Sequence, residues 1–184
     1  MKIGDFETAQ KVLIIAEIGN NHEGSFARAE ELIEKAVDAG ADAVKFQTFI
    51  PEFYVTRRDE ARFQRLKRFQ LSFEQFESLS RTAKSAGVLF LSTPFDLESA
   101  AFLNGIVPAF KIGSGENTFY PLLAAVAETG KPIIMSGGML EISELEYSVS
   151  LIRRIWSERE ITQELAVLHC VSSYPTPPEQ ANLL

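Results

Sequence analysis

The sequence is poor in the residues that build disulfide-rich or metal-centred proteins. Its 184 residues include one cysteine, Cys170, and two histidines, His22 and His169. A single cysteine excludes a disulfide within the chain and is too few for a cysteine-based zinc site. The two histidines show no strong metal-ligand spacing. Cysteine usage of this kind fits a reducing compartment, so we expect a cytoplasmic protein.

The chain also lacks a basic excess and a long hydrophobic run. Its net charge is −7 and its pI about 5.0, whereas nucleic-acid or anionic-membrane binding usually needs positive charge. The apolar run 12–18 is far too short to span a bilayer, and residues 1–9 are too polar for a signal peptide. We therefore expect neither a nucleic-acid partner nor a membrane partner.

Short apolar runs alternate with longer helical patterns through the whole chain. This alternation predicts a parallel sheet, and the nearly continuous apolar strands indicate that helices cover it. No low-complexity segment or linker divides the chain, so residues 1–184 are interpreted as one domain. The predicted strands are 12–19, 43–48, 88–92, 109–112, 132–136 and 165–169.

Capping signals predict five helices between these strands. One begins after Ser25 and ends at Gly40, and another opens with a capping box at Ser72 and stops at Gly87. The others are expected after Asp96, around Pro121, and after Ser143 with Glu146 as its capping partner.

Six βα units fit either a doubly wound sheet or part of a (β/α)8 TIM barrel. A barrel gathers the carboxyl ends of its strands around one mouth, whereas an open sheet spreads them along an edge. Every predicted strand carries a polar side chain at that end, which favours the barrel. A complete barrel needs eight strands and about 250 residues, so two βα units are missing. Either the chain is the N-terminal part of a longer barrel domain, or a partner closes the sheet. The polar residues are Glu17, Lys45, Gln47, Thr93, Lys111, Ser114, Ser136 and His169.

Glu17 interrupts the apolar run of the first strand, in Ile14-Ile15-Ala16-Glu17-Ile18-Gly19. An unpaired buried carboxylate costs several kcal/mol or more. We therefore expect Glu17 to be buried beside a partner, a metal-bound ligand or a substrate. The loop residue His22 follows it at the same mouth, but a lone loop histidine is more often structural.

Two lysines lie inside apolar strands. Lys45 shares one face of its strand with Gln47, and Lys111 precedes the turn Gly113-Ser114-Gly115. Together with the hydroxyls of Ser92, Thr93, Ser114 and Ser136, they predict an anion site of the phosphate type. Taken singly, each lysine could extend to solvent and each hydroxyl could serve a turn.

A basic segment follows the second strand. Residues 49–71 contain Arg57, Arg58 and several further arginines and lysines against few acids. Such a run is usually a solvated helix face. An alternative is a mobile lid over an anionic substrate.

These motifs resemble those of the sialic acid synthase family, which includes the legionaminic, pseudaminic and spore-coat sugar synthases. The family condenses phosphoenolpyruvate with an N-acylated hexosamine to give a nonulosonic acid and phosphate. Five segments match in the family's order across nearly the whole chain: 16–24, 40–48, 91–96, 111–116 and 169–177.

The resemblance implies a role for each matching residue. Glu17 is expected to be the catalytic carboxylate. Tyr174, Gln47 and Glu116 are expected nearer the sugar, and Ser172 stands where some members carry an asparagine that contacts phosphoenolpyruvate. The expected phosphoenolpyruvate contacts are Lys45, Thr93, Lys111, Ser114 and Ser136.

The resemblance also implies parts that the 184 residues do not include. A divalent metal, Mn or Mg, is expected, but the family's ligands would lie beyond Leu184, as would its C-terminal antifreeze-like domain. The full-length protein is expected to be a homodimer, and the isolated chain is expected to be inactive.

Two other functions fit the same residues. A strand-end lysine, Lys45 or Lys111, could be the nucleophile of a Schiff-base aldolase. The chain could also be a non-catalytic remnant that binds phosphate. Glu17 disfavours the second, because an anion binder gains nothing from a nearby negative charge.

Overall fold

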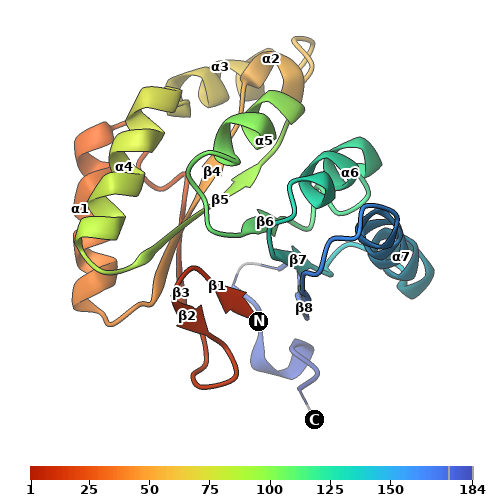
Figure 1. The fold of residues 1–184 in the computed structure, drawn as a ribbon. Helices are drawn as coiled ribbons and strands as arrows, with labels where there is room; N and C mark the ends of the chain where they lie inside the picture. The colour runs from red at the N-terminus through yellow and green to blue at the C-terminus, as the bar shows by residue number, and fades with distance from the viewer. Residues whose placement is uncertain (174, 184) are drawn as a thin grey trace.

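The chain folds as an α/β protein built on parallel strands. The computed structural model describes residues 1–173 and 175–183. All six predicted strands are confirmed, and they form two three-stranded parallel sheets, ordered β3-β4-β5 and β6-β7-β8, with β5 beside β6 (Figure 1). Their bounds are β3 Ile15–Gly19, β4 Ala43–Thr48, β5 Leu89–Pro94, β6 Phe110–Ile112, β7 Ile133–Ser136 and β8 Leu165–Leu168.

Helices follow the strands and form an arc around their outer side (Figure 1). Ser25 and Asp96 cap α1 and α5 as predicted, and Ser72 and Gln75 form the predicted capping box of α4. The bounds are α1 Phe26–Asp38, α2 Pro51–Tyr54, α3 Glu60–Phe69, α4 Phe73–Ser85, α5 Leu97–Leu103, α6 Tyr120–Glu128, α7 Ile142–Glu158 and a 3₁₀ turn Pro178–Gln180.

The predicted start of α7 was wrong by two residues. The helix begins at Ile142, and the side chain of Glu144 accepts a hydrogen bond from the Glu141 amide at 2.9 Å. Glu141 and Glu144 have the capping spacing that was assigned to Ser143 and Glu146, so the box forms earlier and Ser143 lies inside the first turn.

Alternation along the strands separates two apolar cores. Val44 and Phe46 of β4 point to the helices and join a large outer core with Phe76 and Phe90. A smaller inner core lies on the other side of the strands and contains Ile3, Ala43, Leu91, Ala109 and Ile134. Lys45 lies between Val44 and Phe46 in sequence, so strand geometry directs it to the inner side.

An N-terminal hairpin, which the sequence analysis did not predict, fills the inner side. Its strands are β1 Lys2–Ile3 and β2 Phe6–Glu7. Ile3 is fully buried in the inner core, and the Met1 ammonium lies 3.2 Å from the Glu164 carboxylate before β8. The hairpin therefore covers the amino ends of the strands and leaves their carboxyl ends open.

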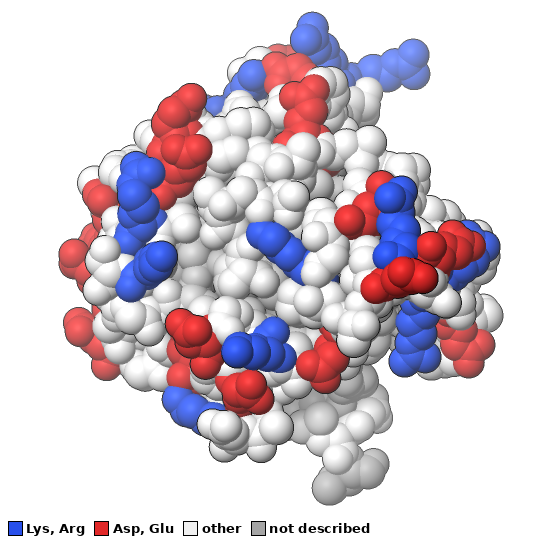
Figure 2. All heavy atoms as spheres, in the orientation of Figure 1, with Lys and Arg blue, Asp and Glu red and all other residues white. Residues whose placement is uncertain are grey.

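The outer surface shows acidic and basic side chains interspersed over the helices on the face drawn in Figure 2. None of the described helices is both long and apolar enough to cross a membrane.

Candidate active site

A cavity of about 890 Å³ opens at the carboxyl ends of the strands. Every described residue that the family resemblance assigned to catalysis or substrate binding lines it, with contributions from β3 to β7 and the loop after β8. Ser92, whose hydroxyl was also predicted to belong to the anion site, does not line the cavity: it is fully buried, and its hydroxyl lies 2.8 Å from that of Thr48. Tyr174 lies outside the described residues. The lining residues that were predicted are Glu17, Lys45, Gln47, Thr93, Lys111, Ser114, Glu116, Ser136 and Ser172.

The two strand lysines are the buried cations of the cavity. Lys111 is only 5% exposed, and its ammonium donates hydrogen bonds to the Ser136 hydroxyl and, at 2.7 Å, to the Ile112 carbonyl. Burial, and secondly the charge of Lys45, lower the pKa of Lys111 to about 8. An anion bound next to Lys111 would stabilise its ammonium form, because the negative charge offsets the cost of burying the positive one.

Glu17 has the partner that was predicted but not the predicted burial. Its carboxylate forms an ion pair with Lys45, whose side chain is 10% exposed, whereas 55% of the Glu17 side chain is exposed. Within the described residues β3 pairs only with β4, so the free edge of β3 leaves Glu17 open to solvent. The pair is therefore accessible to a ligand entering the cavity.

Glu116 is the buried acid of the site, with 7% exposure. Burial raises its pKa to about 7, against the opposing charges of Lys111 and Lys45. A Cβ atom at Gly113 would collide with this carboxyl group, so the glycine gives Glu116 room above β6. The carboxyl group is thus able to gain or lose a proton near neutral pH.

The hydroxyls of Ser114 and Ser172 lie close to the backbone of Gly138. A Cβ atom at Gly138 would lie 2.8 Å from Ser114 Oγ and 3.0 Å from Ser172 Oγ. The Thr93 hydroxyl is buried, and it has no hydrogen-bond partner in the part of the chain that the structure describes. Because unsatisfied buried hydroxyls are costly, Thr93 is suited to bind a ligand oxygen.

Two asparagines that were not predicted brace the cavity walls. Asn20 donates from Nδ2 to Gln47 Oε1 at 2.6 Å. Asn117 donates to the carbonyls of Ser136 and Gly138 at 3.1 and 2.9 Å. Asn20 follows Glu17 in the loop that was expected at the mouth, but no role was predicted for it. Asparagines in loops have many ordinary uses, so nothing in the sequence separated Asn117 from a turn residue.

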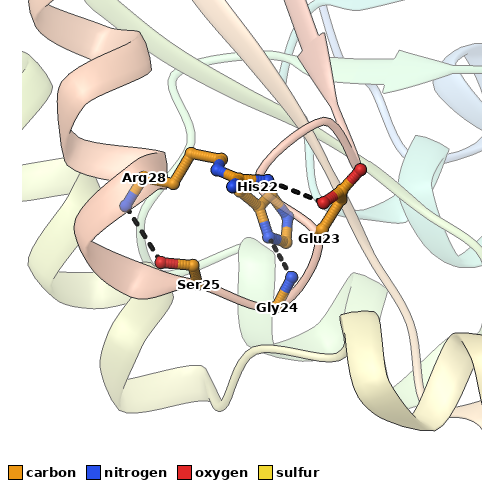
Figure 3. Close-up of polar contacts among 5 residues, drawn as sticks. All are labelled: His22, Glu23, Gly24, Ser25 and Arg28. Atoms are coloured by element: carbon orange, nitrogen blue, oxygen red, sulfur yellow. Dashed lines mark hydrogen bonds and ion pairs between the residues drawn. The ribbon is translucent and has the colours of Figure 1, made fainter.

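His22 and its neighbours in sequence form a network of polar contacts in the loop after β3 (Figure 3). The His22 side chain is buried, with 1% exposure. Its Nδ1 accepts a hydrogen bond from the Gly24 amide at 3.1 Å, and burial lowers its pKa. Gly24 has a φ of 85°, and a Cβ atom there would collide with the Arg68 carbonyl. His22 thus shapes this loop through Nδ1, while its buried Nε2 has no hydrogen-bond partner among the described residues.

The other histidine and the basic segment are placed away from the cavity lining. His169 Nε2 lies 2.7 Å from the Ala181 carbonyl. Arg57 and Arg58 are exposed and do not line the cavity. The residue of the 49–71 segment that does reach the cavity is Tyr54.

The described residues by themselves do not fit a divalent metal. They contain no group of three or more histidine, cysteine, aspartate or glutamate side chains placed to hold one. The carboxylate at the mouth, Glu17, is already paired with Lys45.

Three comparisons with known proteins bear on this site. An uncharacterized protein of Methanocaldococcus jannaschii, MJ1065, is 43% identical over all of this chain and 53% of its own length. The N,N'-diacetyllegionaminic acid synthase of Campylobacter jejuni is 38% identical over 95% of this chain and 55% of its own. The chain thus spans about half the length of these relatives.

A solved structure shows the same fold. The N-acetylneuraminic acid synthetase of Leptospira borgpetersenii, crystallised with citrate, superposes with a TM-score of 0.83 at 34% identity, covering 94% of this chain and 58% of that one. The family model described as the NeuB family matches residues 32–184. The chain therefore belongs to the NeuB family.

Proposed function

We propose that the complete gene product condenses phosphoenolpyruvate with an N-acylated hexosamine and releases inorganic phosphate. The observation that supports this most is the convergence of Lys45, Lys111 and three strand-end hydroxyls on one cavity that also holds two carboxyl groups, Glu17 and Glu116. Cations suit a phosphate and a carboxylate, whereas the acids suit proton transfer and a polyol. The name of the Campylobacter relative, a legionaminic acid synthase, is consistent with this chemistry.

We assign phosphoenolpyruvate to the lysine end of the cavity. Lys45 and Lys111 would neutralise its phosphate and carboxylate, and Thr93, Ser114 and Ser136 would donate hydrogen bonds to its oxygens. Holding the anion in a fixed orientation removes entropy from the barrier of the bimolecular step. We place the sugar toward Gln47, Glu116 and Tyr174, with Ser172 between the two substrates.

The reaction then follows from the positions of the substrates. The methylene carbon of phosphoenolpyruvate attacks the aldehyde carbon of the open-chain sugar, forming a carbon–carbon bond, and the aldehyde oxygen takes a proton. Positive character develops at the phosphate-bearing carbon. Water adds there with loss of a proton, and the bond from that carbon to the phosphate oxygen then breaks.

Glu17 is our candidate for assisting the water. Its carboxylate lies against Lys45 at the mouth and is open to solvent, so a water molecule can reach both the carboxylate and an anion held by the lysine. The family resemblance implies a divalent metal, which would supply Lewis-acid polarisation of the aldehyde when bound. The described residues do not hold one, and the steps assigned here use this chain's own side chains.

The two free strand edges support completion of the sheet as a TIM barrel. Within the described residues β3 and β8 each pair with one strand. Apolar side chains at both edges are exposed, including Ile14 at 53% and Val167 at 43%. Open apolar edges invite pairing. We propose that two further βα units cover them in the complete gene product, which acts as a homodimer.

Phosphate release from the complete gene product tests the function. With manganese or magnesium present, we expect release only when phosphoenolpyruvate and an N-acylated hexosamine are both supplied, and a product whose mass equals their sum plus water minus phosphoric acid. Release with phosphoenolpyruvate alone would instead indicate a phosphatase. A panel of acceptors identifies the sugar.

The lowered pKa of Lys111, about 8, also favours a second candidate, a Schiff-base aldolase, because a neutral amine is the nucleophile of that reaction. Borohydride treatment in the presence of a keto acid separates the two. A covalent adduct on Lys111 or Lys45 would support the aldolase, whereas the synthase leaves both lysines unmodified.

A further inference from the structure

The segment between β4 and α4 supplies one side chain to the cavity, Tyr54 at the end of α2. Its ring is half-buried, although the segment's arginines are exposed. Neither the phosphate site nor the proposed role of Glu17 uses this residue.

Phe49, Phe95 and Arg62 surround the Tyr54 ring, and the centroid of the Phe49 ring lies 6.0 Å from that of Tyr54. The Tyr54 ring stacks on Phe95, which follows β5, with ring centroids 4.6 Å apart and an interplanar angle of 28°. The guanidinium of Arg62 lies over the ring, 5.3 Å from its centroid, and Nη2 donates a hydrogen bond to the Tyr54 hydroxyl at 3.3 Å. Aromatic stacking and a cation–π contact both favour one orientation.

The hydroxyl is arranged as a donor. Its oxygen accepts the hydrogen bond from Arg62, so its own proton remains available for an oxygen in the cavity. Burial, and secondly the charge of Glu116, raise the pKa of Tyr54, so the proton is retained at neutral pH.

The surroundings of Tyr54 suit a sugar better than phosphoenolpyruvate. Glu116, whose charge acts on Tyr54, would repel an anion when ionised. The buried cations have other contacts: Lys111 donates a hydrogen bond to Ser136, and Lys45 is paired with Glu17. The charges that act on Tyr54 are those of Glu116 and Arg62. A hydroxyl donor on an aromatic wall is the type of group that recognises a neutral polyol.

We propose that Tyr54 determines specificity for the amino-sugar acceptor, with its hydroxyl donating a hydrogen bond to an oxygen of the sugar. Phe95 and Arg62 act as positioning residues that hold the ring. The proposal rests on the proposed function, because it assumes that the sugar occupies the Glu116 end of the cavity.

The test is the Tyr54→Phe variant of the complete gene product, which keeps the stacked ring and removes the hydroxyl. Phosphate release is measured with each substrate varied in turn. We expect the KM for the acceptor to rise about threefold to tenfold, as for the loss of one hydrogen bond, with the KM for phosphoenolpyruvate unchanged. The matched control is Tyr147→Phe, which removes a hydroxyl from an α7 residue that is 55% exposed and outside the cavity lining.

A second variant tests the positioning role. Arg62→Met should raise the acceptor KM by a smaller factor and leave the phosphoenolpyruvate KM unchanged. An unchanged acceptor KM in Tyr54→Phe, or an equal rise in both KM values, would overturn the Tyr54 proposal alone. If the unsubstituted protein released no phosphate with any acceptor, the proposed function would fail and the Tyr54 proposal with it.

Discussion

The inner side of the strands is apolar at their amino ends and polar at their carboxyl ends. At the amino ends, Ile3 of the hairpin closes the inner side with Leu91 and Ala109. At the carboxyl ends the inner side is lined by Lys45, Lys111 and other polar groups. The comparison indicates that the amino-end core supplies stability, while the carboxyl-end cavity keeps costly groups for binding.

The largest effect on activity is expected at the polar end. Lys111→Met should lower phosphate release by about 100-fold or more, because it removes a buried cation that would hold the substrate anion. The melting temperature should not fall, since a desolvated charge is replaced by an apolar chain of similar length. Steady-state kinetics and calorimetry check this, with Lys35→Met on the exposed surface of α1 as control. Equal activity of the two variants would contradict a role for Lys111.

The apolar end should show the opposite pattern. Ile3→Ala removes fully buried methyl groups and should lower the free energy of unfolding by about 2–4 kcal/mol. Activity per folded molecule should stay unchanged. Chemical denaturation followed by circular dichroism measures the first, and kinetics below the transition measure the second. A large loss of activity in the folded variant would contradict the proposal that the amino-end core serves stability and not binding.

Glu116 predicts a pH dependence of stability. Its folded pKa of about 7 lies above the ordinary value of 4.5, so the folded state binds the proton more tightly than the unfolded state. Stability that this proton provides is present below pH 4.5 and is lost as the pH rises through 7. Glu116→Gln should therefore gain about 3 kcal/mol in free energy of unfolding over the unsubstituted protein at pH 8 and nothing at pH 4.

Denaturation at the two pH values measures this difference. Glu98→Gln, in the first turn of α5 outside the cavity lining, is the control. A Glu116→Gln advantage that is the same at pH 4 and pH 8 would show that the carboxyl group is not desolvated.

The smallest effect on activity is expected from Asn20, which does not act on the substrate itself but orients Gln47. Asn20→Ala removes the hydrogen bond that turns the Gln47 amide. Because Gln47 Oε1 already accepts from Asn20, we expect Gln47, a lining residue of the cavity, to meet a ligand through its amide N–H groups. The acceptor KM should rise about twofold to fivefold, as for one modest hydrogen bond, and phosphoenolpyruvate affinity should not change. A rise in the phosphoenolpyruvate KM instead would place Gln47 at the other substrate.

Much of this architecture could be predicted because its signals are local. The apolar runs around Val44 and Phe110 identified strands, and the capping residues Ser25 and Ser72 identified helix starts. Parallel strands bring their carboxyl ends together, which is why Lys45 and Lys111 could be assigned to one site before their positions were known.

The remaining features depend on tertiary contacts. The short strands of the hairpin are stabilised by burial of Ile3 rather than by their own pattern. The exposure of Glu17 depends on β3 having a free edge among the described residues, which a buried-looking strand sequence does not reveal. Tyr54 reaches the cavity because it packs on Phe95, a contact across 41 positions of sequence.

The most direct test follows one oxygen atom. Phosphoenolpyruvate carrying ¹⁸O in the bridge between carbon and phosphorus is converted by the complete gene product with an N-acylated hexosamine. Addition of water at the phosphate-bearing carbon, followed by carbon–oxygen cleavage, predicts that the label leaves in inorganic phosphate. Label retained in the organic product would mean phosphorus–oxygen cleavage and would contradict the proposed condensation.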